Sequence, residues 1–272
     1  MLPETFRQHL LTAADAEAGQ FLRGLVGAGV DVLVVLGSGL ADTVTDRWGT
    51  PVATCRLSEV PGVLAPVADG HVDELCVYRR EGRHIAVAMG RTHLYEGHGP
   101  HPVTALARAV TAAGASAAIL CNANGCLRDW SLGDVMAISD HVNFTAASPF
   151  DGTYFLDTSA CWDAELTRVL AEVTQRVGTY AALRGPEYQT RAETRLLAAA
   201  EIDCVGMSTV LEALALHALG VRVAGMSVVS DLSFAAAPTD PSAVVEAAAG
   251  AQATLLAGLD AALAAVDVAP AA

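Results

Sequence analysis

Short apolar runs alternate with longer helical patterns along most of the chain, and this alternation limits the possible folds most strongly. It is typical of a mostly parallel or mixed sheet covered by helices. Strands are expected at residues 31–36, 75–78, 84–89, 117–121, 134–139, 178–183, 203–206 and 221–229. Helices are expected at residues 5–26, 103–113, 160–176, 192–200, 209–219 and 242–266. The sequence therefore predicts an α/β protein with a central mixed β-sheet flanked by helices.

The polar motifs of the chain follow the apolar runs. In open α/β sheets, ligands bind beyond the strand ends, where loops carry polar groups without disrupting the core. Of the 272 residues, 53% are apolar, and no Pro/Ser-rich stretch or charge run divides the chain. We therefore expect one domain spanning residues 1–272.

Charge and cysteine content restrict the partners and the compartment. The chain has 16 Lys and Arg against 30 Asp and Glu, a formal charge of −14, which disfavours nucleic acid and anionic membranes as partners. The six cysteines lack a C-x-x-C pair and are expected to be reduced core thiols. No signal-peptide pattern or transmembrane-length apolar window is present, so a cytoplasmic location is expected.

A tight turn follows the first predicted strand, at Gly37-Ser38-Gly39-Leu40. Backbone amides and the Ser38 hydroxyl can converge there on an anion. The alternative is an ordinary strand turn. A dinucleotide fingerprint is disfavoured because Asp42 stands where the third glycine of that motif would fall.

A second motif begins after the strand that ends near residue 89, where Arg91 and His93 lie two residues apart. In an extended chain both side chains point to the same side, and a guanidinium with an imidazole suits a phosphate dianion. His93, His98 and His101 could suggest a metal site, but no carboxylate or cysteine has a supporting spacing. No metal is predicted.

Two further motifs have ordinary structural explanations as well as functional ones. Residues 119–126 end a predicted strand with an Asn-rich stretch, which alone would indicate an Asx turn or a bulge. Ser208 precedes a predicted helix, and Thr209 and Glu212 have the spacing of a capping box.

The segments around Gly37, Arg91, Gln189 and Met207 together, in this chain order, resemble the trimeric purine nucleoside phosphorylase family, which includes the methylthioadenosine phosphorylases. The resemblance runs from about Leu25 to the C-terminal helix. It implies a nucleoside phosphorylase fold with a partly barrel-like sheet and a homotrimer with sites between subunits. It also implies no cofactor, inorganic phosphate being a co-substrate.

The resemblance also implies a role for each matching residue, with His93, Asn122 and Asp231 as the catalytic set. Phosphate binding is implied for Ser38, Arg91, His93, the Ala123 amide and Ser208. Ribose contacts are implied for Tyr95 and Met207, and base contacts for Asn122, Tyr188, Gln189, Val205, Gly206, Met207 and Asp231. The residue matching Glu212 positions ribose or the Arg91 region. The chain departs from the common pattern at Asn124 and Cys126, where the family carries Ala and Gly.

Gln189 and Asp231 predict the base. The 6-oxopurines present N1–H and O6, which suit a carboxylate at position 189 and an amide at position 231, and here the two are reversed. Gln189 can donate to an unprotonated N1, and ionised Asp231 can accept from a 6-amino group. An acceptor facing O6 would cost about 1–3 kcal/mol. The pair therefore favours adenine.

The 5′ position also departs from the 6-oxopurine pattern, which has a His contacting the 5′-hydroxyl. Residues 241–245 contain no His, and Val244, with Ala243 and Val245 as alternatives, is expected to form an apolar wall. Such a wall favours a 5′-methylthio, 5′-deoxy or 5′-halo group. Phe150 or Tyr154, in a loop shorter than the family's, is expected to reach a neighbouring subunit's site.

The predicted reaction is phosphate attack on C1′ with departure of adenine, assisted by proton delivery from Asp231. Three alternatives remain. One is a 6-oxopurine nucleoside phosphorylase. The second is a nucleoside hydrolase, which would not need the phosphate residues, and the third is a catalytically silent nucleoside-binding protein.

Overall fold

The computed structural model describes residues 10–37, 40, 44–152, 155–235 and 241–266, with only the backbone described for residues 46 and 241–249. The helices are α2 (Ala13–Val26), α3 (Thr45–Trp48), α4 (Pro100–Val103), α5 (Ala105–Ala113), α6 (Ala164–Ala171), α7 (Arg191–Ala199), α8 (Val210–Ala218) and α9 (Pro241–Ala265), with short 3₁₀ turns η2 (Leu57–Glu59) and η3 (Leu94–Glu96). The strands are β1 (Val32–Val35), β2 (Ala53–Cys55), β3 (Leu75–Arg80), β4 (Arg83–Ala88), β5 (Ala117–Cys126), β6 (Val135–Asn143), β7 (Arg176–Ala182), β8 (Cys204–Gly206) and β9 (Arg222–Leu232).

All described strands belong to one mixed sheet in the order β2-β3-β4-β1-β5-β8-β7-β6-β9. An additional pairing of β5 with β9 closes the second half of this sheet into a ring, while β1 to β4 extend from β5 as an open wing. The predicted α/β class, with a mixed and partly barrel-like sheet, is therefore confirmed.

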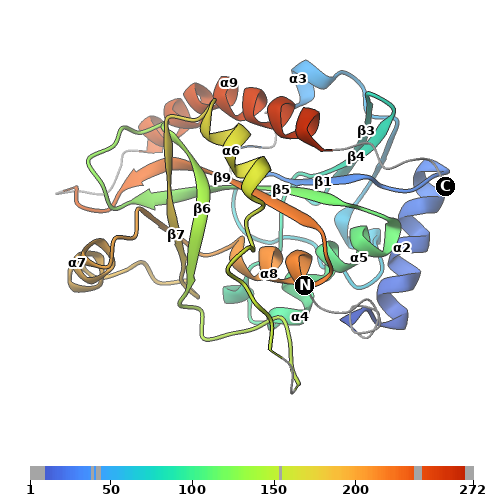
Figure 1. The fold of residues 1–272 in the computed structure, drawn as a ribbon, viewed down its shortest axis with the longest axis horizontal. Helices are drawn as coiled ribbons and strands as arrows, with labels where there is room; N and C mark the ends of the chain where they lie inside the picture. The colour runs from blue at the N-terminus through green and yellow to red at the C-terminus, as the bar shows by residue number, and fades with distance from the viewer. Residues whose placement is uncertain (1–9, 38–39, 41–43, 153–154, 236–240, 267–272) are drawn as a thin grey trace.

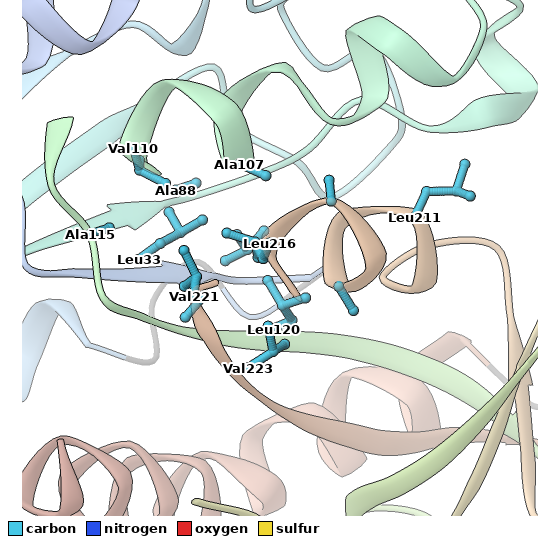
Figure 2. Packing of buried hydrophobic residues seen from close by; sticks show 14 of the residues in the cluster. Leu33, Ala88, Ala107, Val110, Ala115, Leu120, Leu211, Leu216, Val221 and Val223 are labelled. Carbon is cyan, nitrogen blue, oxygen red and sulfur yellow. The ribbon is translucent and has the colours of Figure 1, made fainter. Parts of the chain in front are cut away.

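Helices cover both faces of the sheet (Figure 1): α9 and α6 lie on one side, and α8, α5 and α4 lie on the other. β1 shows how the sequence creates these layers, because successive side chains of a strand point to opposite faces. Leu33 and Val35 pack in the cluster beneath α5 and α8, whereas Val32 and Val34 pack in the cluster beneath α9 and α6. Figure 2 shows the first cluster, where Leu33, Val110 and Leu216 are close together.

The cysteines lie mostly in the core, as the sequence predicted. All six cysteines are free, and every one except the half-buried Cys55 is buried. None of the described helices combines the length and apolarity needed to cross a bilayer.

Several predicted boundaries were wrong because local polar contacts end the elements. The helix expected at residues 5–26 is interrupted at residues 11–12, and α2 starts after Thr12, which forms a capping box with Asp15. The helix expected at 103–113 divides at Thr104 into α4 and α5. The helix expected at 160–176 starts only after its N-cap Asp163 and ends at Ala171.

β5 and β9 are longer than predicted, so that two site residues lie within strands. The two strands pair in parallel as far as Cys126 and Leu232, with a register shift at Asn124/Gly125. Asn122 therefore lies within β5 rather than in a turn, and Asp231 lies within β9. The short strand β2 was not predicted at all.

Two glycines provide a test of the packing. An added Cβ at Gly225 of β9 would lie 2.7 Å from Trp162 Cζ3, whereas at Gly24 of α2 nothing lies within 4 Å. We expect Gly225→Ala to lower the free energy of unfolding by about 1–3 kcal/mol through overpacking. The matched change Gly24→Ala should raise it by about 0.5–1 kcal/mol through helix propensity. Urea denaturation measures both, and a neutral Gly225→Ala would contradict the packing described.

Candidate active site

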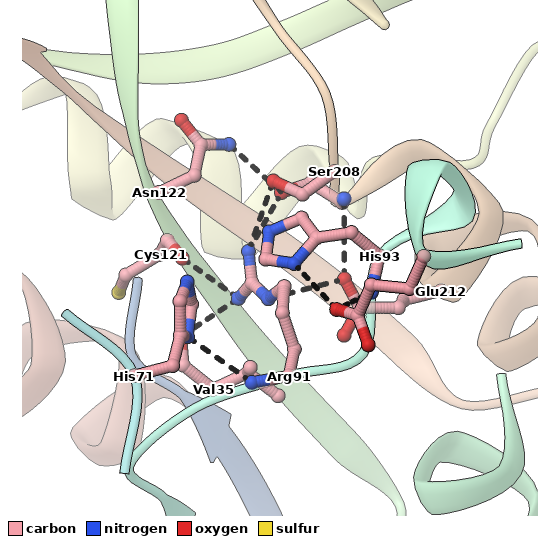
Figure 3. A network of polar contacts seen from close by, with 10 residues as sticks. Val35, His71, Arg91, His93, Cys121, Asn122, Ser208 and Glu212 are labelled. Carbon is pink, nitrogen blue, oxygen red and sulfur yellow. Dashed lines mark hydrogen bonds and ion pairs between the residues drawn. The ribbon is translucent and has the colours of Figure 1, made fainter. Parts of the chain in front are cut away.

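Arg91 joins the loop after β4 to three other parts of the chain (Figure 3). Its side chain is 3% exposed. Nη2 donates to the carbonyl oxygens of Cys121 at 2.8 Å and Val35 at 3.3 Å, which belong to β5 and β1. Nη1 donates to the hydroxyls of Thr209 at 3.1 Å and Ser208 at 3.2 Å, before α8. One buried cation therefore holds β1, β5 and the start of α8 together.

Glu212 in the first turn of α8 balances this cation. Its Oε2 lies 3.5 Å from Arg91 Nε and accepts the Thr209 amide at 3.1 Å. Burial raises the pKa of Glu212, while Arg91 and the Thr209 amide act in the opposite direction. Glu212 thus contacts the N-cap backbone of α8 and the Arg91 side chain at the same time.

Thr209 adopts a backbone conformation that non-glycine residues avoid, with φ of 74°. Such strain persists only where the surrounding structure imposes it, and it concentrates at functional sites. The Thr209 hydroxyl contacts Arg91, accepts from Asn122 Nδ2 at 2.8 Å and lies 3.1 Å from Ser208 Oγ.

The turn after β1 packs directly on β5. A Cβ on Gly37 would lie 2.8 Å from Asn122 Cα and 3.3 Å from the Ala123 amide nitrogen, so only glycine permits this approach. The structure thus brings Gly37, Ala123 and Arg91 to one place, as the sequence motifs predicted. Ser38 lies outside the described residues.

His93 lines the same pocket as Met207 and Ser208. Its backbone amide donates to Glu96 Oε1 at 2.7 Å, and its Nδ1 lies 3.3 Å from the same oxygen. Burial first, then Arg91 and His71, lower the pKa of His93 to about 3. The ring is therefore neutral near pH 7 and offers a ligand hydrogen bonds rather than charge.

Tyr95 and Met207 lie next to each other beside His93. The Tyr95 ring stacks on His93 with centroids 4.7 Å apart. A Cβ on Gly185 would lie 3.0 Å from Tyr95 Cδ1 and would collide with the Met207 sulfur. Tyr95 and Met207, both predicted to contact ribose, therefore converge on Gly185 from different elements.

A second group of residues converges on Gly125. Gln189 Nε2 donates to Ser233 Oγ at 3.0 Å, and a Cβ on Gly125 would lie 2.7 Å from that hydroxyl and 3.5 Å from Val205 Cγ1. Asp231 is half-buried and is the register partner of Gly125. The predicted base residues Gln189, Val205 and Asp231 are thus neighbours.

Other predicted residues are placed differently. Tyr188 is 83% exposed, and Gly206 packs against the Tyr180 hydroxyl. Phe150 is half-buried against the chain's own core. Tyr154 lies outside the described residues, and of Val244 only the helical backbone is described. Among the side chains that the structure describes, no three His, Cys, Asp or Glu gather as a metal site.

Sequence reasoning missed three residues of the site. Ser227 donates to Asn122 Oδ1, and its Oγ accepts from Asn124 Nδ2 at 2.7 Å. Ser233 holds Gln189, and the ring of His71 lies 4.9 Å from that of His93. Ser227 had a signal, since it is the one polar residue in the apolar run of residues 223–229.

Comparison with known proteins agrees with this geometry. The family model described as Phosphorylase superfamily matches residues 29–264. The chain belongs to the phosphorylase superfamily. It is 41% identical over 206 residues to the purine nucleoside phosphorylase of Mycobacterium leprae, covering 75% of this chain and 76% of that protein.

Further relatives carry the same description. The purine nucleoside phosphorylase of Cellulomonas sp is 39% identical over 219 residues, covering 78% of this chain and 77% of its own length. That of Bos taurus is 32% identical over 219 residues, covering 74% and 75%. These relatives place the chain among phosphorylase-superfamily enzymes that transfer a pentosyl group.

The buried histidines predict a pH dependence of stability. Burial and then Arg91 lower the pKa of His71 to about 4, and the pKa of His93 is lowered further, to about 3. Below pH 6.5 the unfolded chain binds protons that the folded form does not, so the free energy of unfolding should fall as pH falls from 6.5 to about 4. In His93→Gln, urea denaturation from pH 7 to 4.5 should show a shallower decline than in the wild type. Identical slopes would contradict a neutral buried His93.

Proposed function

We propose that the chain is a purine nucleoside phosphorylase that uses inorganic phosphate to cleave 6-aminopurine nucleosides with a modified 5′ position. The observation that carries the proposal is the convergence of Arg91, His93 and Ser208 beside the Gly37 turn and the Ala123 amide. Relatives described as purine nucleoside phosphorylases support the reaction class.

The site suits a small anion despite the acidic chain. Arg91 supplies the charge, while neutral His93, the Ser208 hydroxyl and the Ala123 amide supply oriented hydrogen-bond donors or acceptors. Phosphate held there would attack C1′ of a ribose lying against Tyr95 and Met207. Holding both reactants in place removes much of the entropic cost of the bimolecular step.

The departing purine needs neutralisation of its developing charge. Asp231 lies beside Gly125 at the base end, where its carboxylate would relay a proton to N7 through water. Asn122 has its amide oriented from both sides, with Nδ2 donating to Thr209 and Oδ1 accepting from Ser227. It is therefore preorganised to hold the ring.

Asp231 discriminates the base more strongly than Gln189. The Ser233 hydroxyl that contacts Gln189 can donate as well as accept, so the amide can turn over without losing this contact. An ionised carboxylate cannot exchange acceptor for donor in this way. The 6-amino preference is therefore assigned to Asp231.

Base release from 5′-methylthioadenosine, 5′-chloro-5′-deoxyadenosine, adenosine and inosine, each with and without phosphate, tests the proposal. We expect phosphate-dependent release with the highest kcat/KM for the 5′-modified adenosines. A preference for inosine would contradict the assigned base, and release without phosphate would contradict the mechanism.

The double variant Asp231→Asn with Gln189→Glu tests the same assignment from the protein side. It should lower kcat/KM for the best adenine nucleoside by about 10- to 100-fold and raise that for inosine, because the acceptor facing the 6-position becomes a donor. The single variant Gln189→Glu is the control, and it should shift the preference less.

We further propose a homotrimer, as the family resemblance implies. Phe144, Phe155 and Phe234 expose half or more of their surface, and exposed aromatic rings favour burial in a subunit contact. Light scattering should give about three times the chain mass of 28.0 kDa. A monomeric mass would overturn this part of the proposal.

A further inference from the structure

The network around Thr209 has a direction, because several of its members can only donate. Arg91 Nη1 and Asn122 Nδ2 both donate to Thr209 Oγ1. Neither nitrogen can accept, and a hydroxyl has two acceptor positions. Both positions are therefore filled, and the Thr209 proton is left for Ser208 Oγ, 3.1 Å away.

The same count applies to Ser208. Its Oγ accepts from Thr209 and from Arg91 Nη1 at 3.2 Å, which fills its acceptor positions and leaves only its own O–H. The nearby buried Tyr180 hydroxyl also interacts with Ser208 and is the other group that this proton can reach. Ser208 lines the pocket together with His93 and Met207. Its O–H is therefore available to a ligand there.

The direction extends back to the base end of the site. Asn124 Nδ2 donates to Ser227 Oγ at 2.7 Å, Ser227 donates to Asn122 Oδ1, and Asn122 Nδ2 donates to Thr209. After Asn124, each link of this chain, from Ser227 through Asn122 to Thr209, thus both accepts and donates. Hydrogen bonds in such a chain polarise one another.

We propose that Thr209 and Ser227 are positioning residues of a one-way hydrogen-bond chain that presents the Ser208 O–H to phosphate. This inference rests on the phosphate site proposed above. Neither residue touches phosphate in this scheme. Thr209 acts by directing the Ser208 proton, and Ser227 acts by fixing the Asn122 amide so that its Nδ2 faces Thr209. The strained backbone of Thr209 places its hydroxyl at this junction.

Steady-state kinetics with varied phosphate tests the inference. Thr209→Val keeps the size and β-branching but removes the hydroxyl, and it should raise KM for phosphate by about 10- to 100-fold, the loss expected for a hydrogen bond to a charged group. Thr209→Ser restores the hydroxyl and should return KM to within a few-fold of the wild type. Thr111→Val, which removes a hydroxyl bonded within α5, should leave KM unchanged.

The decisive measurement is a double-mutant cycle. If Thr209 acts through Ser208, Thr209→Val should change KM for phosphate little in a Ser208→Ala background. An undiminished effect in that background would overturn the positioning role. If Ser208→Ala alone leaves KM unchanged, the proposed phosphate site itself is wrong.

Ser227 gives an independent test should Thr209→Val not fold. Ser227→Ala should raise KM for phosphate by about 3- to 10-fold, less than Thr209→Val because it acts one link further away. Ser227→Thr, which keeps the hydroxyl, should recover most of this loss. An unchanged KM in Ser227→Ala would contradict the chain.

Discussion

The buried guanidinium of Arg91 is the interaction on which the site depends. A charge that is 3% exposed must be paired and hydrogen-bonded to be tolerated. The partners come from the ends of β1 and β5 and from the start of α8, which lie 56, 30 and 118 residues from Arg91 in sequence. The hydrogen bonds of this guanidinium therefore fix how the open wing of the sheet, the closed ring and helix α8 are placed relative to one another.

Two unusual backbone features follow from this meeting. Gly37 lies so close to the β5 backbone that a Cβ there would be 2.8 Å from Asn122 Cα. Thr209 takes a positive φ of 74° that brings its hydroxyl to Arg91 and its amide to Glu212. Close packing and strain thus occur where four elements converge, which is consistent with functional geometry stored in the fold.

The sequence predicted most of the sheet but less of its edges. Apolar runs such as that of β1 identify buried strands because burial on both faces needs continuous hydrophobicity. Where a strand ends depends on the strand with which it pairs. The extension of β5 through Asn122 can therefore be recognised only from its pairing with β9. The Arg91 and Ser208 motifs were recognisable because they are short and local. Thr209 was assigned only a capping role, and Ser227 and Ser233 were not predicted, because their contacts join residues tens to more than a hundred positions apart.

The electrostatics explain how an acidic chain can hold an anion. His71 and His93 are kept neutral by burial and by Arg91, so positive charge is confined to the guanidinium, and buried Glu212 lies on the other side of it. The remaining groups are hydroxyls and amides whose directions are set by their partners. Fixed dipoles of this kind favour a small ligand at one position but give no long-range attraction to polyanions. The orientation of these groups depends in turn on the hydrogen-bonded side chains that surround Arg91.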